Sequence, residues 1–245
     1  MGRKSVILLF EELRKRLIII ALTVFAAAVV CFMFSEEIRH ILLLPGAMVL
    51  PGFEAVGFDM QLIFLTPSEA FLANMRLAVI TGATVTLPII LYQCAALALT
   101  VAGKVHRAAV WLTLAMYVLF VVGLSFAYFV VLPFTLNFFI GFSSADLVPR
   151  FSVARYITFA TTFLFSFGLV FQLPLIFWFM GSIGLVNAAF LRHNRKFALL
   201  FILIFAAILT PPDIFSQVLM AVPLLLLYEL GIILVSLTRR KPELL

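Results

Sequence analysis

Long apolar segments alternate with short polar ones along the whole chain. A helix needs about 20 apolar residues to cross the roughly 30 Å of hydrocarbon in a bilayer. Six segments approach or exceed that length, at residues 17–35, 71–97, 109–132, 156–180, 197–210 and 214–237. The pattern therefore predicts an all-α integral membrane protein with six transmembrane helices, forming a single membrane domain over residues 1–245.

The fifth segment is the shortest of the six. Residues 197–210 would extend only about 21 Å as a helix, at roughly 1.5 Å per residue. Either this helix crosses a locally thinned bilayer, or the fifth and sixth segments form a hairpin that enters the membrane without a full crossing. We favour short fifth and sixth spans.

Two connecting segments are expected to have structure of their own. Residues 1–16 are expected to form a cytoplasmic interfacial helix, and residues 36–70 an exterior loop that caps the bundle. Thr66-Pro67-Ser68-Glu69 and Thr210-Pro211-Pro212-Asp213 each place a hydroxyl, a proline and a carboxylate in the order that starts a helix. Glu69 and Asp213 are therefore predicted to accept the first backbone N–H groups of the second and sixth spans.

The distribution of basic residues predicts the orientation. Arg39, Arg76, Arg150 and Arg155 lie on one side of the predicted spans, and the rest of the 17 Lys and Arg residues lie on the other. Short cytoplasmic loops carry the excess of Lys and Arg. Both termini are therefore predicted to be cytoplasmic, and the formal net charge of +6 indicates orientation in a lipid bilayer rather than nucleic acid as a partner.

Composition excludes several classes of protein. The chain is 65% hydrophobic and 11% charged, with a mean hydropathy of +1.24, whereas soluble domains are about 45–50% apolar and about 25% charged. Soluble enzymes, nucleic-acid-binding modules and disordered proteins are therefore excluded. The chain lacks nucleotide-binding glycine motifs, and its two cysteines and three histidines are not spaced as metal ligands. We expect no catalytic site, no metal and no cofactor.

A few polar residues fall inside the predicted spans, where they are costly and therefore candidates for function. They are Gln93, Gln172, Gln217 and Glu229. Gln172 lies two residues before Pro174, which frees a backbone carbonyl and kinks the helix. Its amide either satisfies that kink or faces a wet, substrate-accessible cavity. Glu229 lies about 12 Å from the cytoplasmic end of the sixth span, so it must pair, face water or be protonated.

The segment before the first span carries both signs of charge. Glu11 and Lys15, and likewise Glu12 and Arg16, are four residues apart and can pair on a helix surface, each pair contributing roughly a few tenths of a kcal/mol. Alternatively, a carboxylate here is offered to a cationic ligand from the cytoplasm. A guanidinium bound by a carboxylate is a strong and geometrically specific contact. The residues alone leave both interpretations open.

Five sequence blocks occur in a characteristic order. They are EELRKRL before the first span, LPIILYQ ending the second, FAYFVVLP ending the third, FGLVFQLP in the fourth, and RKFALL followed by LTPPDIFSQVLMAVPLLLLYE across the fifth and sixth. Together with six spans and both ends inside, this order closely resembles the TatC family, the core of the twin-arginine protein translocase. The resemblance runs from about Glu11 to Leu237, and the last block is a specific motif.

The resemblance implies a receptor in the inner (cytoplasmic) membrane that binds twin-arginine signal peptides of folded precursor proteins. It also implies TatA- and TatB-type single-span partners in a multimeric complex, transport driven by the proton-motive force, and a cupped six-helix bundle. Glu12 and Arg14 match the acidic and basic residues of the family's cytoplasmic signal-recognition patch. Other characteristic positions of the family are occupied by Pro45, Phe126, Pro133, Asp213, Gln217 and Glu229.

Three positions depart from the family's pattern. Leu9 stands where the family usually has His, His106 where a second recognition carboxylate is expected, and Gln172 where the fourth span usually carries Glu. A histidine cannot attract an arginine, and an amide cannot hold a charge. We hypothesise that Glu11 and Glu12 together replace the missing carboxylate pair.

Other interpretations stay open beside the receptor. The departures are compatible with a divergent paralogue that has relaxed or dedicated substrate recognition. A six-span secondary transporter is disfavoured, because such proteins usually show repeated halves around a midplane site and this chain shows no such repeat. A passive membrane scaffold is a further alternative.

Overall fold

The structure is a computed structural model that describes residues 3–48, 66–101, 107–141, 152–209 and 214–237. Every regular element in these ranges is a helix, which confirms the predicted all-α class. The elements are α1 (Arg3–Met33), α2 (Ser35–Met48), α3 (Pro67–Val85), α4 (Leu87–Val101), α5 (Arg107–Phe126), the π-helix η1 (Ala127–Val131), α6 (Leu132–Ile140), α7 (Val153–Val170), α8 (Leu173–Ser182), α9 (Ala188–His193), α10 (Arg195–Leu209) and α11 (Ile214–Leu237).

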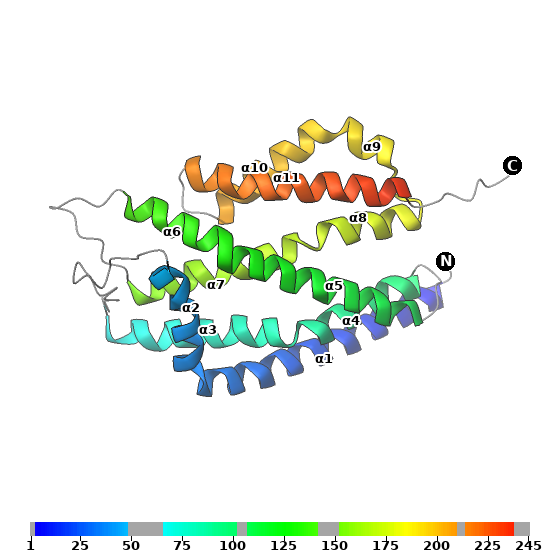
Figure 1. Ribbon diagram of the computed structural model, residues 1–245. Coiled ribbons are helices and arrows are strands. Elements are labelled where there is room, and N and C mark those ends of the chain that lie inside the picture. The colour runs from blue at the N-terminus through cyan, green and yellow to red at the C-terminus, as the bar shows by residue number, and fades with distance from the viewer. Residues whose placement is uncertain (1–2, 49–65, 102–106, 142–151, 210–213, 238–245) are drawn as a thin grey trace, which may run out of the picture. The chain divides into compact units, whose positions relative to one another are not determined.

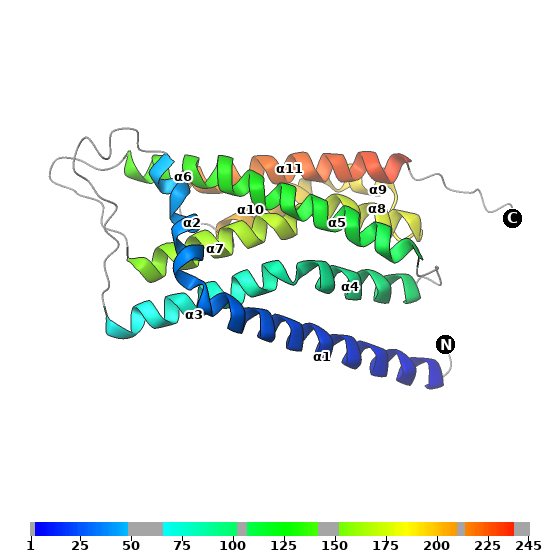
Figure 2. The same cartoon turned by 60° about the horizontal axis from the view of Figure 1, so that its bottom comes forward.

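The helices pack as two compact units. The first unit comprises residues 1–118 and 143–161, and the second comprises residues 119–142 and 162–245. In the first unit α1 packs along α3, and α2 lies across the start of α3 (Figures 1 and 2). In the second unit α11 packs against both α8 and α10 (Figure 1).

The apolar helices are those of a multi-pass membrane protein. Four helical stretches of the described residues are long and apolar enough to cross a membrane: Glu11–Met33, Ala109–Phe139, Val153–Ser182 and Gln217–Leu237. A fifth is Ser68–Val85 with Leu87–Leu97, if this pair, bent by 53°, is counted as one span. They coincide with five of the six predicted spans.

The remaining predicted span corresponds to α10, which has only 15 residues and is short as expected. Helix α11 has 24 residues and extends about 36 Å, so the prediction of a short sixth span is wrong. Pro223 lies inside α11 and does not end the helix.

Two predicted boundaries also differ. The expected interfacial helix and first span are one continuous helix, α1. The expected exterior loop over 36–70 starts with helix α2, whose first turn carries Glu36 and Glu37. Acidic residues there complement the positive end of the helix dipole and favour helix over loop. Pro45 is buried inside α2, and the Tyr156 hydroxyl donates to the nearby Leu42 carbonyl at 2.9 Å.

Prolines account for three interruptions in the long helices. Pro88 lies at the 53° bend between α3 and α4, and Pro174 follows the break between α7 and α8. Pro133 follows η1, where the Leu132 N–H donates to the carbonyl of Ala127, five residues earlier. Proline removes the N–H that the helix needs and crowds the carbonyl four residues before it, so the chain bends or widens locally.

Aromatic side chains pack around Phe126 within the second unit. Its ring centroid lies 6.3 Å from that of Phe167 and 5.8 Å from that of Phe171, within the range of favourable aromatic pairs. Gly123, one turn earlier on α5, leaves room for Phe171, because a Cβ at Gly123 would lie 2.6 Å from that ring. Phe126 therefore joins the end of α5 to α7.

Candidate functional site

Four charged residues of α1 face the middle of α4 and line a pocket with it. Glu11, Glu12, Lys15 and Arg16 are at helical spacings of one, three and four residues, so they share one side of α1. Together with Ile19, Tyr92, Gln93 and Ala96 they surround about 550 Å³. We call this the α1–α4 pocket; it lies wholly within the first unit.

Arg16 is the centre of the hydrogen bonding in the α1–α4 pocket. Its Nη2 lies 2.6 Å and its Nε 3.2 Å from Oε1 of Glu12. Its Nη1 donates to the side-chain oxygen of Gln93 at 3.0 Å and to the backbone carbonyl of Gln93 at 3.3 Å. Only 14% of the Arg16 side chain is exposed. One guanidinium therefore neutralises Glu12 and ties α1 to α4.

The second carboxylate of the pocket is less constrained. Glu11 is exposed, and no ion pair joins it to Lys15 or to any other residue of the described ranges. The predicted Glu12–Arg16 pair is confirmed, whereas the predicted Glu11–Lys15 pair is wrong. A long exposed lysine gains little by fixing one rotamer against an exposed carboxylate. Glu11 is thus accessible to a cation that enters the pocket.

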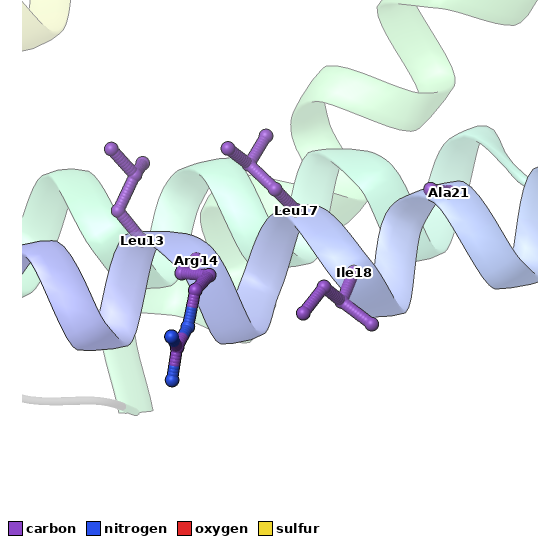
Figure 3. Close-up of a pocket in the computed structure, with 5 residues that line it drawn as sticks. All are labelled: Leu13, Arg14, Leu17, Ile18 and Ala21. Atoms are coloured by element: carbon purple, nitrogen blue, oxygen red, sulfur yellow. The ribbon is translucent and has the colours of Figure 1, made fainter.

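Arg14 does not share the α1–α4 pocket with Glu12. It lines a separate, almost wholly apolar hollow of about 470 Å³ with Leu13, Leu17, Ile18 and Ala21, all on α1. Figure 3 shows the Arg14 side chain pointing away from Leu13 and Leu17. Two of the four predicted patch residues, Glu11 and Glu12, are therefore brought together and Arg14 is not. His106 lies outside the described residues, as does Asp213.

The role of Gln93 was not anticipated from the sequence. The sequence marks Gln93 as a polar residue within the second predicted span, but no local motif connects it with Glu12 or Arg16. The contact could have been predicted from two positions in the sequence. Arg16 lies at the start of the first span, and Gln93 lies near the end of the second. If consecutive spans run antiparallel, these two positions lie at the same depth and can meet.

Gln172 closes the break in the fourth predicted span. The Gln172 backbone N–H donates to Leu169 at 3.0 Å, which leaves the Gly168 carbonyl without its helical donor. The Gln172 side-chain Nε2 donates to that carbonyl at 3.2 Å. Gln172 is only 3% exposed, and its Oε1 is buried without a hydrogen-bond partner in the described part of the chain. The geometry supports the interpretation in which the Gln172 amide satisfies a backbone carbonyl freed at the kink. It does not support the alternative, in which Gln172 faces a wet cavity.

Gln217 and Glu229 both join α11 to α10 within the second unit. Gln217 Nε2 donates to the Leu203 carbonyl at 3.0 Å. Glu229 Oε2 lies 2.6 Å from Nη2 of Arg195, the first residue of α10. The side chains of Arg195 and Glu229 are 54% and 45% exposed within the chain. Of the three possibilities for Glu229, pairing is the one observed.

Glu69 contacts the start of α7 as well as lying in the first turn of α3. It lies in the first turn of α3, but its Oε1 accepts from the Ser152 hydroxyl and from the Ala154 N–H at 3.3 Å. Both of these groups belong to the start of α7. Thr66 forms no side-chain cap on α3, so the predicted hydroxyl cap is wrong. The Glu69 carboxylate complements the positive end of the dipole of α7, although Glu69 itself belongs to α3.

The arrangement suits recognition of a cation. The α1–α4 pocket offers two carboxylates, an amide and a phenol, which can accept hydrogen bonds from a guanidinium. The described residues contain no group of three or more His, Cys, Asp or Glu side chains that could hold a metal ion. A pocket of this kind can bind a charged peptide.

The family model and the individual relatives that match this chain carry the same description. The sequence model of the family described as Sec-independent protein translocase protein (TatC) matches residues 9–223. The chain is 36% identical over 226 residues to the Sec-independent protein translocase protein TatC of Desulforapulum autotrophicum, covering 91% of this chain and 80% of that protein. It is 34% identical over 233 residues to the TatC of Carboxydothermus hydrogenoformans, covering 94% and 92%.

Solved structures show the same relationship. The crystal structure of a twin arginine translocase receptor, TatC, superposes with a TM-score of 0.83 at 32% sequence identity. The superposition covers 95% of this chain and 100% of that one. A second crystal structure of that receptor, in the detergent DDM, gives the same TM-score and identity over 94% of this chain.

Proposed function

Because the chain belongs to the TatC family of Sec-independent protein translocase proteins, we propose that it is the receptor subunit that binds twin-arginine signal peptides of folded precursor proteins. Family membership makes the chain a component of a protein translocase and not a catalytic enzyme. The receptor role is the more specific step, and it is supported by a solved relative that is itself described as a twin arginine translocase receptor.

The observation that carries this proposal is the pair of carboxylates in the α1–α4 pocket. Glu11 is exposed, and Glu12 already holds a guanidinium, that of Arg16, at 2.6 Å. The groups that an arginine side chain needs as partners are therefore present in the pocket. A signal-peptide arginine would pair with Glu11, and a second would compete with Arg16 for Glu12 or donate to the amide oxygen of Gln93.

Site-specific photocrosslinking tests the proposal. We would place a photoreactive residue at position 11, 12 or 92 and add a radiolabelled precursor in membranes, with the exposed position 18 as the control on the same helix but outside the pocket. Crosslinks at 11, 12 and 92 are expected with a twin-arginine precursor and are expected to disappear with a twin-lysine precursor. Lysine keeps the charge but lacks the planar fork that a carboxylate binds in two places.

Other outcomes discriminate between the alternatives. Crosslinks that persist with the twin-lysine precursor would favour a divergent paralogue with relaxed recognition. An absence of crosslinks in a folded, inserted protein would refute the receptor role. Peptide binding to Glu11→Ala and Glu12→Ala variants tests the shared role of the two carboxylates: equal losses are expected, and an unaffected Glu11→Ala variant would show that Glu11 does not compensate.

The wider assembly is part of the same proposal. We infer a location in the inner (cytoplasmic) membrane, six spans with both termini cytoplasmic, TatA- and TatB-type single-span partners, and transport driven by the proton-motive force. Gln217 and Glu229 link α11 to α10. In this proposal the two contacts fix the position of α10 against α11. Co-purification tests the assembly, because a translocase should retain single-span partners and signal-peptide precursors, whereas a secondary transporter should not.

A further inference from the structure

Two arginines, one at the middle of α3 and one in the first turn of α7, have no acidic partner in the described part of the chain. Arg76 lies on α3, Arg155 lies on α7, and both are exposed. The ion pairs among the described residues are Glu12–Arg16, Glu36–Arg39 and Glu229–Arg195. Arginine stays charged at any pH that the protein meets, and a charge in or beside a membrane needs a counter-charge or water.

Thr158 connects the two arginines within the first unit. Nη1 of Arg76 donates to the Thr158 hydroxyl oxygen at 3.2 Å. Arg155 precedes Thr158 by three residues on α7, so these two side chains lie on one face of that helix, a turn apart. Two cations and a hydroxyl therefore share one surface. The neighbouring Arg39 differs, because it has both Glu36 at 3.8 Å and the Asn74 amide oxygen at 3.4 Å as partners.

The surface around Arg76 is apolar. Leu72 and Val79 lie four residues before and three residues after Arg76, which places them on the same face of α3. They are 47% and 48% exposed. On a membrane-spanning helix, such a face contacts acyl chains, and an arginine within it extends its guanidinium toward the headgroups.

From this arrangement we propose that Arg76, Arg155 and Thr158 form a binding site for the phosphodiester headgroup of an anionic phospholipid. The guanidinium forks bind phosphate oxygens in two places. The Thr158 oxygen accepts from Arg76, which leaves its O–H to donate to the phosphate. The acyl chains lie on Leu72 and Val79. A free phosphate ion would use the cations but not this apolar face, so the lipid is the ligand that fits the whole surface.

The lipid site is independent of the signal-peptide proposal. Its residues belong to α3 and α7, whereas those of the α1–α4 pocket belong to α1 and α4, so the two sites share no residue. It requires only that the chain spans a membrane. Loss of lipid binding and loss of signal-peptide binding would therefore be separate results.

Lipid binding to the purified full chain in detergent tests the site. The probes are phosphatidylglycerol and phosphatidylcholine with the same acyl chains, and retained lipid is counted by native mass spectrometry across a titration. The wild type is compared with the Arg76→Gln/Arg155→Gln double variant and with an Arg192→Gln/Lys196→Gln control, which also removes two exposed cations. Each arginine near an anionic lipid contributes about fivefold in affinity.

The expected result is phosphatidylglycerol binding at least about tenfold weaker in the double variant and within about twofold of wild type in the control. An Arg76→Lys/Arg155→Lys variant preserves the charge but lacks the planar guanidinium groups. Its affinity for phosphatidylglycerol should be about threefold lower than that of the wild type. Three results would overturn the proposal: equal binding of the two lipids to wild type, equal losses in the Gln variant and the control, or unchanged binding in the Lys variant. Stabilisation by inorganic phosphate equal to that by phosphatidylglycerol would also overturn it, since the site would then be one for free anions.

Discussion

Arg16 shows at the scale of one residue how a charge is accommodated at the start of a membrane span. It contacts a carboxylate, a side-chain amide and a backbone carbonyl from two helices. Each hydrogen bond to a charged group stabilises by about 1.5–3 kcal/mol relative to leaving the partner unpaired. Because Arg16 occupies Glu12, a signal-peptide arginine would have to compete with it. The stability of the α1–α4 contact and the proposed peptide recognition therefore depend on the same guanidinium.

We predict that Arg16→Ala lowers the free energy of unfolding by about 2 kcal/mol, measured by thermal unfolding in detergent. Arg16→Lys should recover less than half of this loss, because an ammonium group cannot reach Glu12 and both Gln93 oxygens at once. The matched control is Lys15→Ala, which removes an exposed neighbour of the same charge and should change stability little. Equal effects of the Arg16 and Lys15 variants would contradict the structure.

At the scale of elements, the contact between α1 and α3 depends on a close approach of their backbones. A Cβ added at Gly82 would lie 2.7 Å from the backbone N and 2.8 Å from the Cα of Ala28. Backbone atoms of a helix cannot move aside as a side chain can. Small residues at such contacts are typical of helix pairs in membranes, where packing replaces the hydrophobic effect.

Gly82→Ala is therefore predicted to destabilise the chain by about 1–3 kcal/mol through overpacking, which corresponds to roughly 5 °C in thermal unfolding at this chain length. Gly181→Ala is the control: its nearest neighbour is a Val235 methyl group at 3.0 Å, which can rotate away. A Gly82 variant as stable as the Gly181 variant would show that α1 and α3 are farther apart than described.

The short helix α10 is held at its start by contacts to α11. Arg195 pairs with Glu229, and the Tyr228 hydroxyl donates to the Leu191 carbonyl of α9 at 2.8 Å. Glu229 lies eight residues before the end of α11, so α10 begins about 12 Å below that end. Helix α10 is therefore fixed to α11 partway along α11 and not at its end.

Charge reversal tests the Arg195–Glu229 pair. Glu229→Arg should lower the unfolding temperature, and the Arg195→Glu/Glu229→Arg swap should restore at least half of the loss. The coupling energy is expected to be about 1 kcal/mol, because both side chains are about half exposed. A swap no more stable than Glu229→Arg alone would mean that the pair does not form.

At the scale of the whole molecule, the fold consists of two compact units that share the long helices α5 and α7. Four helices and one bent pair have the length and apolarity of spans, while α10 is shorter. The path of the chain through the membrane therefore depends on whether α10 and α11 both cross. The proposed cytoplasmic location of the α1–α4 pocket depends on this topology.

Reporter fusions are expected to give six crossings. Alkaline phosphatase inserted after residue 57 or 146 should be active, and after residue 104 or 245 inactive, because the enzyme matures only outside the cytoplasm. A fluorescent protein after residue 245 should be bright. Active phosphatase at residue 245 together with inactive phosphatase at residue 104 would leave an odd number of crossings and show that only one of α10 and α11 crosses.

Residues close together in the sequence were sufficient to predict several features of the structure. Runs of apolar residues predicted the helical spans, since a membrane leaves the backbone few other ways to satisfy its hydrogen bonds. Pro174 predicted the break in the fourth span, the spacing of Glu12 and Arg16 predicted their pair, and the five sequence blocks predicted the family. Each of these depends on residues close together in the sequence or on a motif.

Tertiary structure alone decided which distant groups meet. Glu69 caps α7 because Ser152 and Ala154 are packed beside it, Arg16 bonds to Gln93 across 77 residues, and Glu229 pairs with Arg195. Arg14, although adjacent in sequence, faces another side of α1. A polar side chain in a low-dielectric setting takes the partner that packing brings within about 3 Å. Sequence spacing determines which helix face a residue occupies, but only the packing of helices determines what that face meets.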